Sequence, residues 1–322
     1  MIKYQDLLQK SKAYSLICGD IQENMLSHAY MIVSEDNGAL EEFYKLFLIA
    51  EYCSNRCGKC TTCTKILNRN HADIFHIEKE KSITVDDIKG IVEESFVSSV
   101  EGGKKTFVIH GGERMTTGAQ NKLLKILEEP PKDVVFLIGC TNINAMLPTV
   151  KSRVKKIQLD VFDEEDIYSE LLHFTDDTDK AKVASICSEG QISKAVDLLY
   201  DTKYLELYNS AVNLLKELNH SSEIIKYINL DMFSKPNISN TLDILMVILR
   251  DVAIVTKNEN LVLSKHIMSD IRQLSYKFST ASCIGIIERI EKYKKMLYYN
   301  INNTNVAEQL LFSILEVKFR CN

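Results

Sequence analysis

The chain has no tryptophan, and its 322 residues include only 4 prolines and 12 glycines. Because proline and glycine interrupt helices and mark turns, this shortage predicts a helix-rich protein. No apolar run approaches the roughly 18 residues of a membrane-spanning helix. The longest candidate, residues 242–255, carries charges at Asp243, Arg250 and Asp251. The N-terminus also lacks the basic and apolar stretches of a secretory signal. We therefore expect a cytoplasmic protein without membrane contact.

The chain also lacks an excess of positive charge, since its formal net charge is −5. A protein that held DNA mainly through the phosphates would be basic. The charge balance therefore counts against DNA binding by this chain alone, although a local basic face is compatible with it. With 45% hydrophobic and 26% charged residues, the composition is that of a globular protein with two or three domains.

Four of the nine cysteines fall within one short tract, at Cys53, Cys57, Cys60 and Cys63. In a cytoplasmic protein such a cluster is not a disulfide framework. Structural zinc takes four tetrahedral ligands, and thiolates at this spacing can share one ion. We therefore predict a structural zinc held by all four thiolates. Two alternatives stay open. One is an iron–sulfur cluster, whose bacterial pattern has its long gap last and a proline after it. The other is a set of metal-free cysteines.

Short apolar runs alternate with helical patterns over residues 1–158. We expect strands at residues 28–34, 73–77, 106–110 and 134–140, and helices at 41–52, 85–95 and 119–129. Thr84 and Asp87 resemble a capping box at the start of the second helix. A strand, a helix and a second apolar strand imply a parallel sheet that is buried on both faces. Ligands of such sheets bind at the carboxyl ends of the strands.

The remainder of the chain has helical patterns throughout. Residues 159–202 are expected to form a small helical domain, and its acidic start is typical of a solvated helix N-terminus. Residues 203–322 are expected to form a larger all-helical domain. Its last helix has one apolar face, formed by Leu310, Leu311, Ile314 and Leu315, with Lys318 one turn further along.

The loop after the first expected strand lacks the pattern that binds nucleotide phosphates. A P-loop has the form Gly-x4-Gly-Lys-Ser/Thr, in which backbone N–H groups and the lysine hold the phosphates and the hydroxyl holds magnesium. Here the loop has one glycine, Gly38, and Leu40 and Glu41 stand near the Lys and Ser/Thr positions. Carboxylates around Gly38 would repel a triphosphate. After the third strand only Glu113 remains, displaced from the place of a magnesium ligand. We therefore expect no nucleotide hydrolysis by this chain.

Several tracts resemble the bacterial clamp-loader branch of the AAA+ superfamily. They are residues 103–110 (Gly-Lys-Lys-Thr-Phe-Val-Ile-His), 115–131 (Met-Thr-Thr-Gly-Ala through Glu-Glu-Pro-Pro) and 136–153, which end in Ser-Arg. The similarity covers about residues 20–160 and is weaker beyond. It implies an α/β parallel-sheet AAA+ (P-loop-like) core at residues 1–158, with a zinc module at about residues 53–63. It also implies a small helical lid domain at residues 159–202 and an all-α oligomerisation (collar) domain at residues 203–322.

The resemblance also implies partners and a role. Clamp loaders are hetero-pentamers of gamma/tau ATPases, delta and further subunits, which place the sliding clamp on primer–template DNA within the DNA polymerase III holoenzyme. A non-hydrolysing member lacks a complete P-loop and keeps the Ser-Arg motif, and this chain fits that pattern. Arg153, with Ser152, would then reach a neighbour's ATP site in trans, where a guanidinium stabilises the transferring γ-phosphoryl group. The expected cofactor is structural zinc, with ATP not bound productively.

The sequence departs from the family in three places. Val154 replaces the cysteine that follows Ser-Arg. The first cysteine gap is short, which leaves coordination by Cys53 open. Thr141 or Asn142 falls at the family's γ-phosphate sensor, and without a cradle we expect this position only to end the strand. Two other functions stay open: a gamma/tau-like ATPase that binds ATP despite the degenerate loop, and a standalone zinc-dependent DNA-binding protein.

Overall fold

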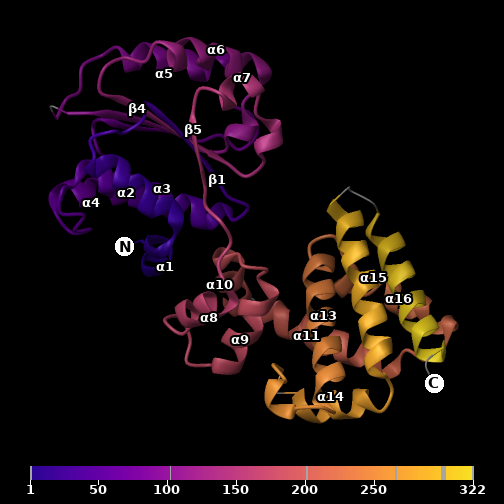
Figure 1. Ribbon diagram of the computed structural model, residues 1–322. Helices are drawn as coiled ribbons and strands as arrows, with labels where there is room; N and C mark the ends of the chain where they lie inside the picture. The colour runs from indigo at the N-terminus through magenta and orange to yellow at the C-terminus, as the bar shows by residue number, and fades with distance from the viewer. Residues whose placement is uncertain (1, 102, 201, 265–266, 299–301, 321–322) are drawn as a thin grey trace. The chain divides into compact units, whose positions relative to one another are not determined.

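The computed structural model describes residues 2–101, 103–200, 202–264, 267–298 and 302–320 (Figure 1). The chain divides into two compact units. The first consists of residues 1–170 and 190–194, and the second of residues 171–189 and 195–322. The expected boundaries near residues 158 and 202 stay a prediction. Among the described residues, no helix combines the length and the apolar character that a membrane crossing requires.

The first unit is built on a five-stranded sheet in the order β2-β3-β4-β1-β5. The strands are β1 (Ala29–Val33), β2 (Ile74–Ile77), β3 (Lys105–Ile109), β4 (Val134–Cys140) and β5 (Lys155–Gln158). All neighbouring strands are parallel. Val33 lies opposite both Cys140 and Gln158, so the carboxyl ends of the three strands lie together at one edge. The four predicted strands are present, and β5 was not predicted.

Helices cover both faces of this sheet, as Figure 1 shows: α2 and α3 lie on one face, and α5 and α6 on the other. The helices of this region are α1 (Gln5–Lys10), α2 (Lys12–Gln22), α3 (Asn37–Tyr52), α4 (Thr61–Leu67), α5 (Val85–Ser95), α6 (Thr117–Glu128) and α7 (Pro148–Lys151), with 3-10 turns η1 (Gly112–Arg114) and η2 (Ile143–Ala145). Every residue of β1, β3 and β4 is buried. Burial on both faces explains why these strands read as continuous apolar runs.

The predicted helix bounds are correct for α5 and short for α3. α5 has the expected range, and Thr84 and Asp87 form the expected capping box. α3 begins at Asn37 rather than at residue 41, because the Asp36 side chain caps its first turn. This additional turn occupies the segment in which a P-loop would stand.

The rest of the chain is helical. The helices are α8 (Glu164–Leu171), α9 (Thr178–Cys187), α10 (Ile192–Tyr200), α11 (Thr202–Glu217), α12 (Ile224–Ile228), α13 (Ile238–Val255), α14 (Met268–Ser275), α15 (Thr280–Tyr298) and α16 (Asn303–Arg320), with 3-10 turns η3 (Ser221–Glu223), η4 (Asp231–Phe233) and η5 (Glu259–Leu261). Within the second unit, α13 packs against α9, α11, α14 and α15. The predicted apolar face of α16 is buried, and Lys318 donates to the carbonyl oxygen of Leu218 at 2.8 Å. The parallel sheet covered by helices and the helical remainder confirm the predicted α/β core followed by helical segments.

Candidate functional site

The connection between β1 and α3 leaves no phosphate cradle. β1 ends at Val33 and α3 begins at Asn37, so only Ser34–Asp36 join them. The N–H of Ala39 donates to the Asp36 carboxylate at 2.9 Å, and the N–H of Leu40 donates to the Asp36 carbonyl oxygen at 3.0 Å. N–H groups at the start of such a helix are the ones that bind phosphate in P-loop proteins. Here the chain's own oxygens accept these bonds.

A distant segment of the chain closes the same place. Asp36 is only 3% exposed, and its carboxylate accepts the N–H of Ser193 at 3.0 Å as well as the Ser193 hydroxyl. A Cβ atom on Gly38 would lie 2.4 Å from the Cβ of Ser193. The glycine is therefore required for the approach of this segment. From the sequence we expected the carboxylates around Gly38, which include Asp36, only to repel phosphate, although Asp before a helical apolar pattern is an N-cap signal.

A closed polar network fills the carboxyl ends of β2 and β3. His110 is 1% exposed, and its Nδ1 lies 2.7 Å from Glu41 Oε1 while its Nε2 lies 3.0 Å from His76 Nδ1. Burial and the neighbouring His110 lower the pKa of His76 to about 4. Arg69 donates to the second oxygen of Glu41 at 3.0 Å. Glu41, at the Ser/Thr position of a P-loop, is thus engaged by side chains of the protein.

A cavity of about 460 Å³ lies beside this network and is lined by Asn37, Glu41, Lys45, Leu67, Asn68, Arg69, Glu78 and Arg114. Each of its cations has a protein oxygen as partner. Arg69 also donates to Glu78 at 2.7 Å, Lys45 pairs with Glu42 at 2.7 Å, and Arg114 donates to the carbonyl oxygen of His110 at 2.9 Å. The cations of the lining are therefore already engaged by oxygens of the protein, two of which belong to the lining carboxylates Glu41 and Glu78.

Glu113 and the two sensor-position residues support the loops around β4. Glu113 accepts the N–H of Thr141 at 3.1 Å and its hydroxyl at 3.0 Å. Asn142 accepts the N–H of Asn144 at 3.0 Å and so caps η2. These hydrogen bonds hold Glu113, Thr141 and Asn142 in the loops at the carboxyl end of β4.

Arg153 lies just beyond α7 and, unlike the buried Asp36, is partly exposed. Its side chain is 35% exposed and pairs with Glu128 at the end of α6, with Nη2 and Oε1 2.6 Å apart. Its Nη1 donates to the carbonyl oxygen of Thr149 at 2.9 Å. The Ser152 hydroxyl donates to that same carbonyl oxygen at 3.0 Å. The guanidinium is thus held at the surface by one exposed carboxylate and by the backbone of α7.

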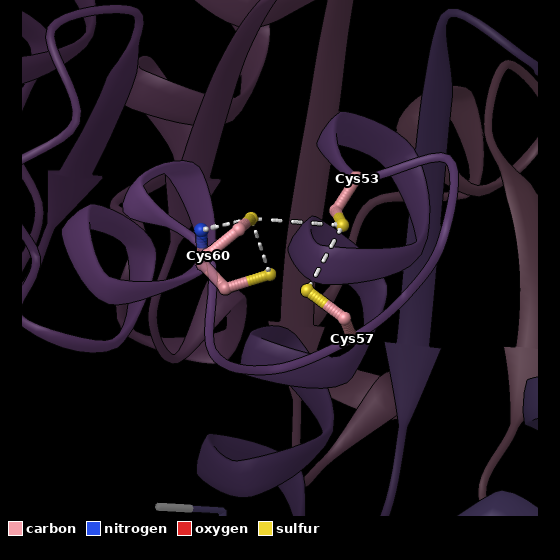
Figure 2. Close-up of side chains that lie close together, drawn as sticks. Cys53, Cys57 and Cys60 are labelled. Carbon is pink, nitrogen blue, oxygen red and sulfur yellow. Dashed lines mark hydrogen bonds between the residues drawn. The ribbon is translucent and has the colours of Figure 1, made fainter.

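The four cysteines come together at the start of α4. Figure 2 shows the sulfur atoms of Cys53, Cys57 and Cys60 pointing toward one another. The sulfur of Cys53 lies 3.8 Å from those of Cys57 and Cys60, and the sulfur of Cys60 lies 3.5 Å from that of Cys63. All four sulfurs lie within 4.8 Å of one another. Cys53, which the short first gap had left open, is therefore part of the cluster.

The geometry of the cluster fits a tetrahedral metal site. With zinc–sulfur bonds of about 2.3 Å, the sulfurs of a tetrahedral site lie about 3.8 Å apart. Backbone N–H groups of Lys59 and Cys60 donate to the Cys57 sulfur and lower the pKa of this thiol to about 6. Burial raises the pKa of Cys63 to about 12, so this thiol needs a cation to ionise. The four cysteines could hold a metal ion, and their spacing is compatible with zinc.

The sequence comparisons find subunits of DNA polymerase III. Residues 9–163 match the model of the family described as "DNA polymerase III, delta subunit". The chain is 25% identical over 316 residues to the DNA polymerase III subunit delta' of Bacillus subtilis, covering 95% of this chain and 96% of that protein. It is 33% identical over 135 residues to the delta' subunit of Pseudomonas aeruginosa, covering 39% of this chain and 41% of that protein.

The chain is also similar to gamma subunits. It is 23% identical over 341 residues to the DNA polymerase III subunit gamma of Buchnera aphidicola subsp. Acyrthosiphon pisum, covering 98% of this chain and 91% of that protein. The chain is 27% identical over 159 residues to the DNA polymerase III subunit gamma of Buchnera aphidicola, which is 48% of this chain and 44% of that protein. A crystal structure of a gamma subunit-related protein from Thermotoga maritima superposes with a TM-score of 0.44 and 19% identity, covering 96% of this chain and 100% of that chain.

Proposed function

We propose that this protein is the non-hydrolysing delta'-type subunit of a clamp loader. Residues 9–163 match the DNA polymerase III delta-subunit family model, and the similarity to one delta' subunit spans nearly the whole chain. In this role it would assemble with gamma/tau ATPases and delta in a hetero-pentamer that loads the sliding clamp on primer–template DNA. Its place would be the cytoplasm, at the replisome.

One observation carries the proposal: the position of the phosphate cradle is filled by the protein itself, whereas Arg153 keeps a partly exposed guanidinium. Asp36 and the additional turn of α3 occupy the position of a phosphate cradle. The side chain of Arg153, after α7, is 35% exposed and pairs with the exposed carboxylate of Glu128. A subunit in this state is suited to serving the ATP of a neighbour rather than its own.

The chemistry that we propose for Arg153 is stabilisation of charge in trans. An arginine is permanently charged and presents a planar fork of donors to phosphate oxygens. Its present partner, Glu128, is 51% exposed, and an exposed pair of this kind contributes at most about 1 kcal/mol. Exchange of Glu128 for a triphosphate with more charge would therefore meet little resistance.

We further propose that the cysteine cluster holds one structural zinc. No histidine or carboxylate belongs to the cluster among the described residues, so all four positions of a tetrahedral ion would be filled by thiolates. Such an ion would fix the start of α4 and, through it, Arg69, whose partners are Glu41 and Glu78.

The finger role is tested in a reconstituted loader that carries Arg153→Ala. An arginine finger contributes on the order of 10³-fold or more to turnover at the site it serves. We expect a large loss of clamp- and DNA-stimulated ATP turnover, with the loader still assembled. Lys156→Ala is the matched control, because Lys156 is an exposed cation of the nearby β5. Unchanged turnover with Arg153→Ala in the assembled loader would remove the finger role.

The second candidate function is a gamma/tau-like ATPase subunit, and the similarity to gamma subunits, one of which matches nearly the whole chain, favours it. It requires that the isolated chain bind ATP and magnesium. The short connection Ser34–Asp36 counts against this candidate, because the N–H groups that would meet the phosphates already have acceptors.

A further inference from the structure

We propose that the Asp36 carboxylate is an internal substitute for a phosphate group, and that it holds the segment Gly190–Lys194 on the N-terminus of α3 without any nucleotide. The inference deepens the proposed non-hydrolysing role, on which its functional meaning rests. Its geometry comes entirely from contacts within the first unit.

The donors around Asp36 form the environment of a bound anion. Three donors converge on the carboxylate: the N–H of Ala39, the N–H of Ser193 and the hydroxyl of Ser193. Ala39 belongs to the first turn of α3, and Ser193 belongs to the first turn of α10. N–H groups in a first helical turn have no acceptor within their own helix and favour an anion. The carboxylate thus satisfies two helix N-termini at once, as a phosphate could.

The surroundings of this carboxylate are almost fully buried. Asp36 and Ser34 are each 3% exposed, and the Ser34 hydroxyl accepts the N–H of Asp36 at 3.2 Å. Gly38 leaves room for Ser193, since any added Cβ atom would overlap it. A free phosphate could enter only if the carboxylate left.

A second set of contacts fixes the other end of the segment. The N–H of Phe162 donates to the carbonyl oxygen of Gly190 at 2.9 Å. Gly190 has a φ of +84°, and a Cβ atom there would lie 2.7 Å from the Cβ of Val161. The segment is therefore attached at both ends, at Gly190 to residues 161–162 and at Ser193 to Asp36. A segment that a phosphate positioned would be released when the phosphate left, whereas a covalently attached carboxylate stays.

The test is amide hydrogen exchange on the full isolated chain, with Asp36→Ala compared with the wild type. We expect exchange in residues 190–194 to rise at least about tenfold, while exchange in β4 stays unchanged. Asp86→Ala is the matched control, because Asp86 is an exposed carboxylate in the first turn of α5. It should leave residues 190–194 as they are in the wild type.

Chemical rescue distinguishes a phosphate substitute from a simple helix cap. Millimolar inorganic phosphate, compared with chloride at equal ionic strength, should restore protection of residues 190–194 in Asp36→Ala and change nothing in the wild type. If the alanine variant fails to fold, Asp36→Asn serves in its place: it keeps one acceptor oxygen for Ala39 and should expose residues 190–194 partially.

Two outcomes would overturn the inference: wild-type exchange at residues 190–194 in the variants, or no rescue by phosphate. Either failure is distinguishable from a failure of the proposed function, because Arg153→Ala is measured in the assembled loader and does not involve Asp36. Lost turnover with Arg153→Ala, together with normal exchange in Asp36→Ala, would remove this inference alone.

Discussion

Two places on the first unit, the connection after β1 and the turn after α7, carry charged groups in opposite states. Asp36 is buried, and all of its observed donors belong to this chain. Arg153 is partly exposed and pairs with the surface carboxylate of Glu128 and with the carbonyl oxygen of Thr149. A buried charge with three donors is costly to disturb, whereas an exposed pair is easily exchanged. Under the proposed function, this difference separates a side of the domain that is closed to ligands from a side that serves a partner.

Removal of the metal should have the largest effect, because it should release the contacts of Arg69 with Glu41 and Glu78. The cysteine cluster precedes α4, and Arg69 beyond α4 holds Glu41 and Glu78. Because a structural zinc contributes roughly 10 kcal/mol or more to its module, Cys60→Ala should abolish metal binding and unfold residues 53–70 locally. Metal analysis should find one zinc per wild-type chain. The control variant Cys18→Ala, which lies outside the cluster, should also contain one zinc per chain. Iron, or no metal, in the wild type would contradict the zinc assignment.

Glu51, a carboxyl group on α3, should make the stability of the first unit depend on pH. Glu51 is half-buried, but its carboxyl group lies inside the protein, where the Thr106 hydroxyl at 2.9 Å is its only hydrogen-bond donor among the described residues. Burial of this group raises the pKa of Glu51 to about 7. Between pH 4.5 and 7 the folded state keeps a proton that the unfolded state has lost. Stability from this group therefore falls as pH rises through that window. Glu51→Gln should stabilise the protein by roughly 2 kcal/mol more at pH 8 than at pH 5, measured by urea unfolding. An equal effect at both pH values would contradict the assignment.

Gly38→Ala compares two opposing effects: the higher helix propensity of alanine and the close contact of Ser193 with Gly38. An alanine inside a helix is favoured over glycine by about 1 kcal/mol, but here its Cβ atom would displace Ser193. We expect faster hydrogen exchange in residues 190–194 without a matching gain in thermal stability. Gly90→Ala on α5, where no atom lies within 4 Å of an added Cβ, should give the full gain. Equal gains in the two variants would mean that Ser193 does not press on Gly38.

Glu128→Gln should have the smallest effect, and it tests how much the ion pair with Glu128 restrains the Arg153 side chain. The pair with Arg153 is exposed, so its loss should change the free energy of unfolding by less than about 0.5 kcal/mol. Turnover of a reconstituted loader should stay within about twofold of the wild type. Glu129→Gln, its exposed neighbour, is the control. A tenfold loss specific to Glu128→Gln would show that this carboxylate positions the guanidinium.

Local patterns were sufficient to predict the core of the first unit. The apolar runs of β3 and β4 predicted adjacent parallel strands because burial on both faces leaves no polar alternation. The Thr84–Asp87 spacing predicted the start of α5, since the capping box lies within one turn. The cysteine spacing predicted the cluster for the same reason: the four ligands are neighbours in sequence.

Features that depend on distant partners were not predictable from such patterns. The first turn of α3 read as a loop at Asp36-Asn-Gly38, and its cap is completed by Ser193. β5 has one buried residue, Ile157, and its strand conformation comes from pairing with β1. The bonds of His110 to Glu41 and His76 require three elements to meet. In each case the decisive contact comes from another element of the fold.

Binding of labelled ATP with magnesium to the isolated wild-type chain tests the closed side most directly. The account predicts no saturable binding at micromolar ATP and no turnover, because Asp36 and the first turn of α3 occupy the cradle. Micromolar binding accompanied by hydrolysis would contradict it and would favour the ATPase subunit instead.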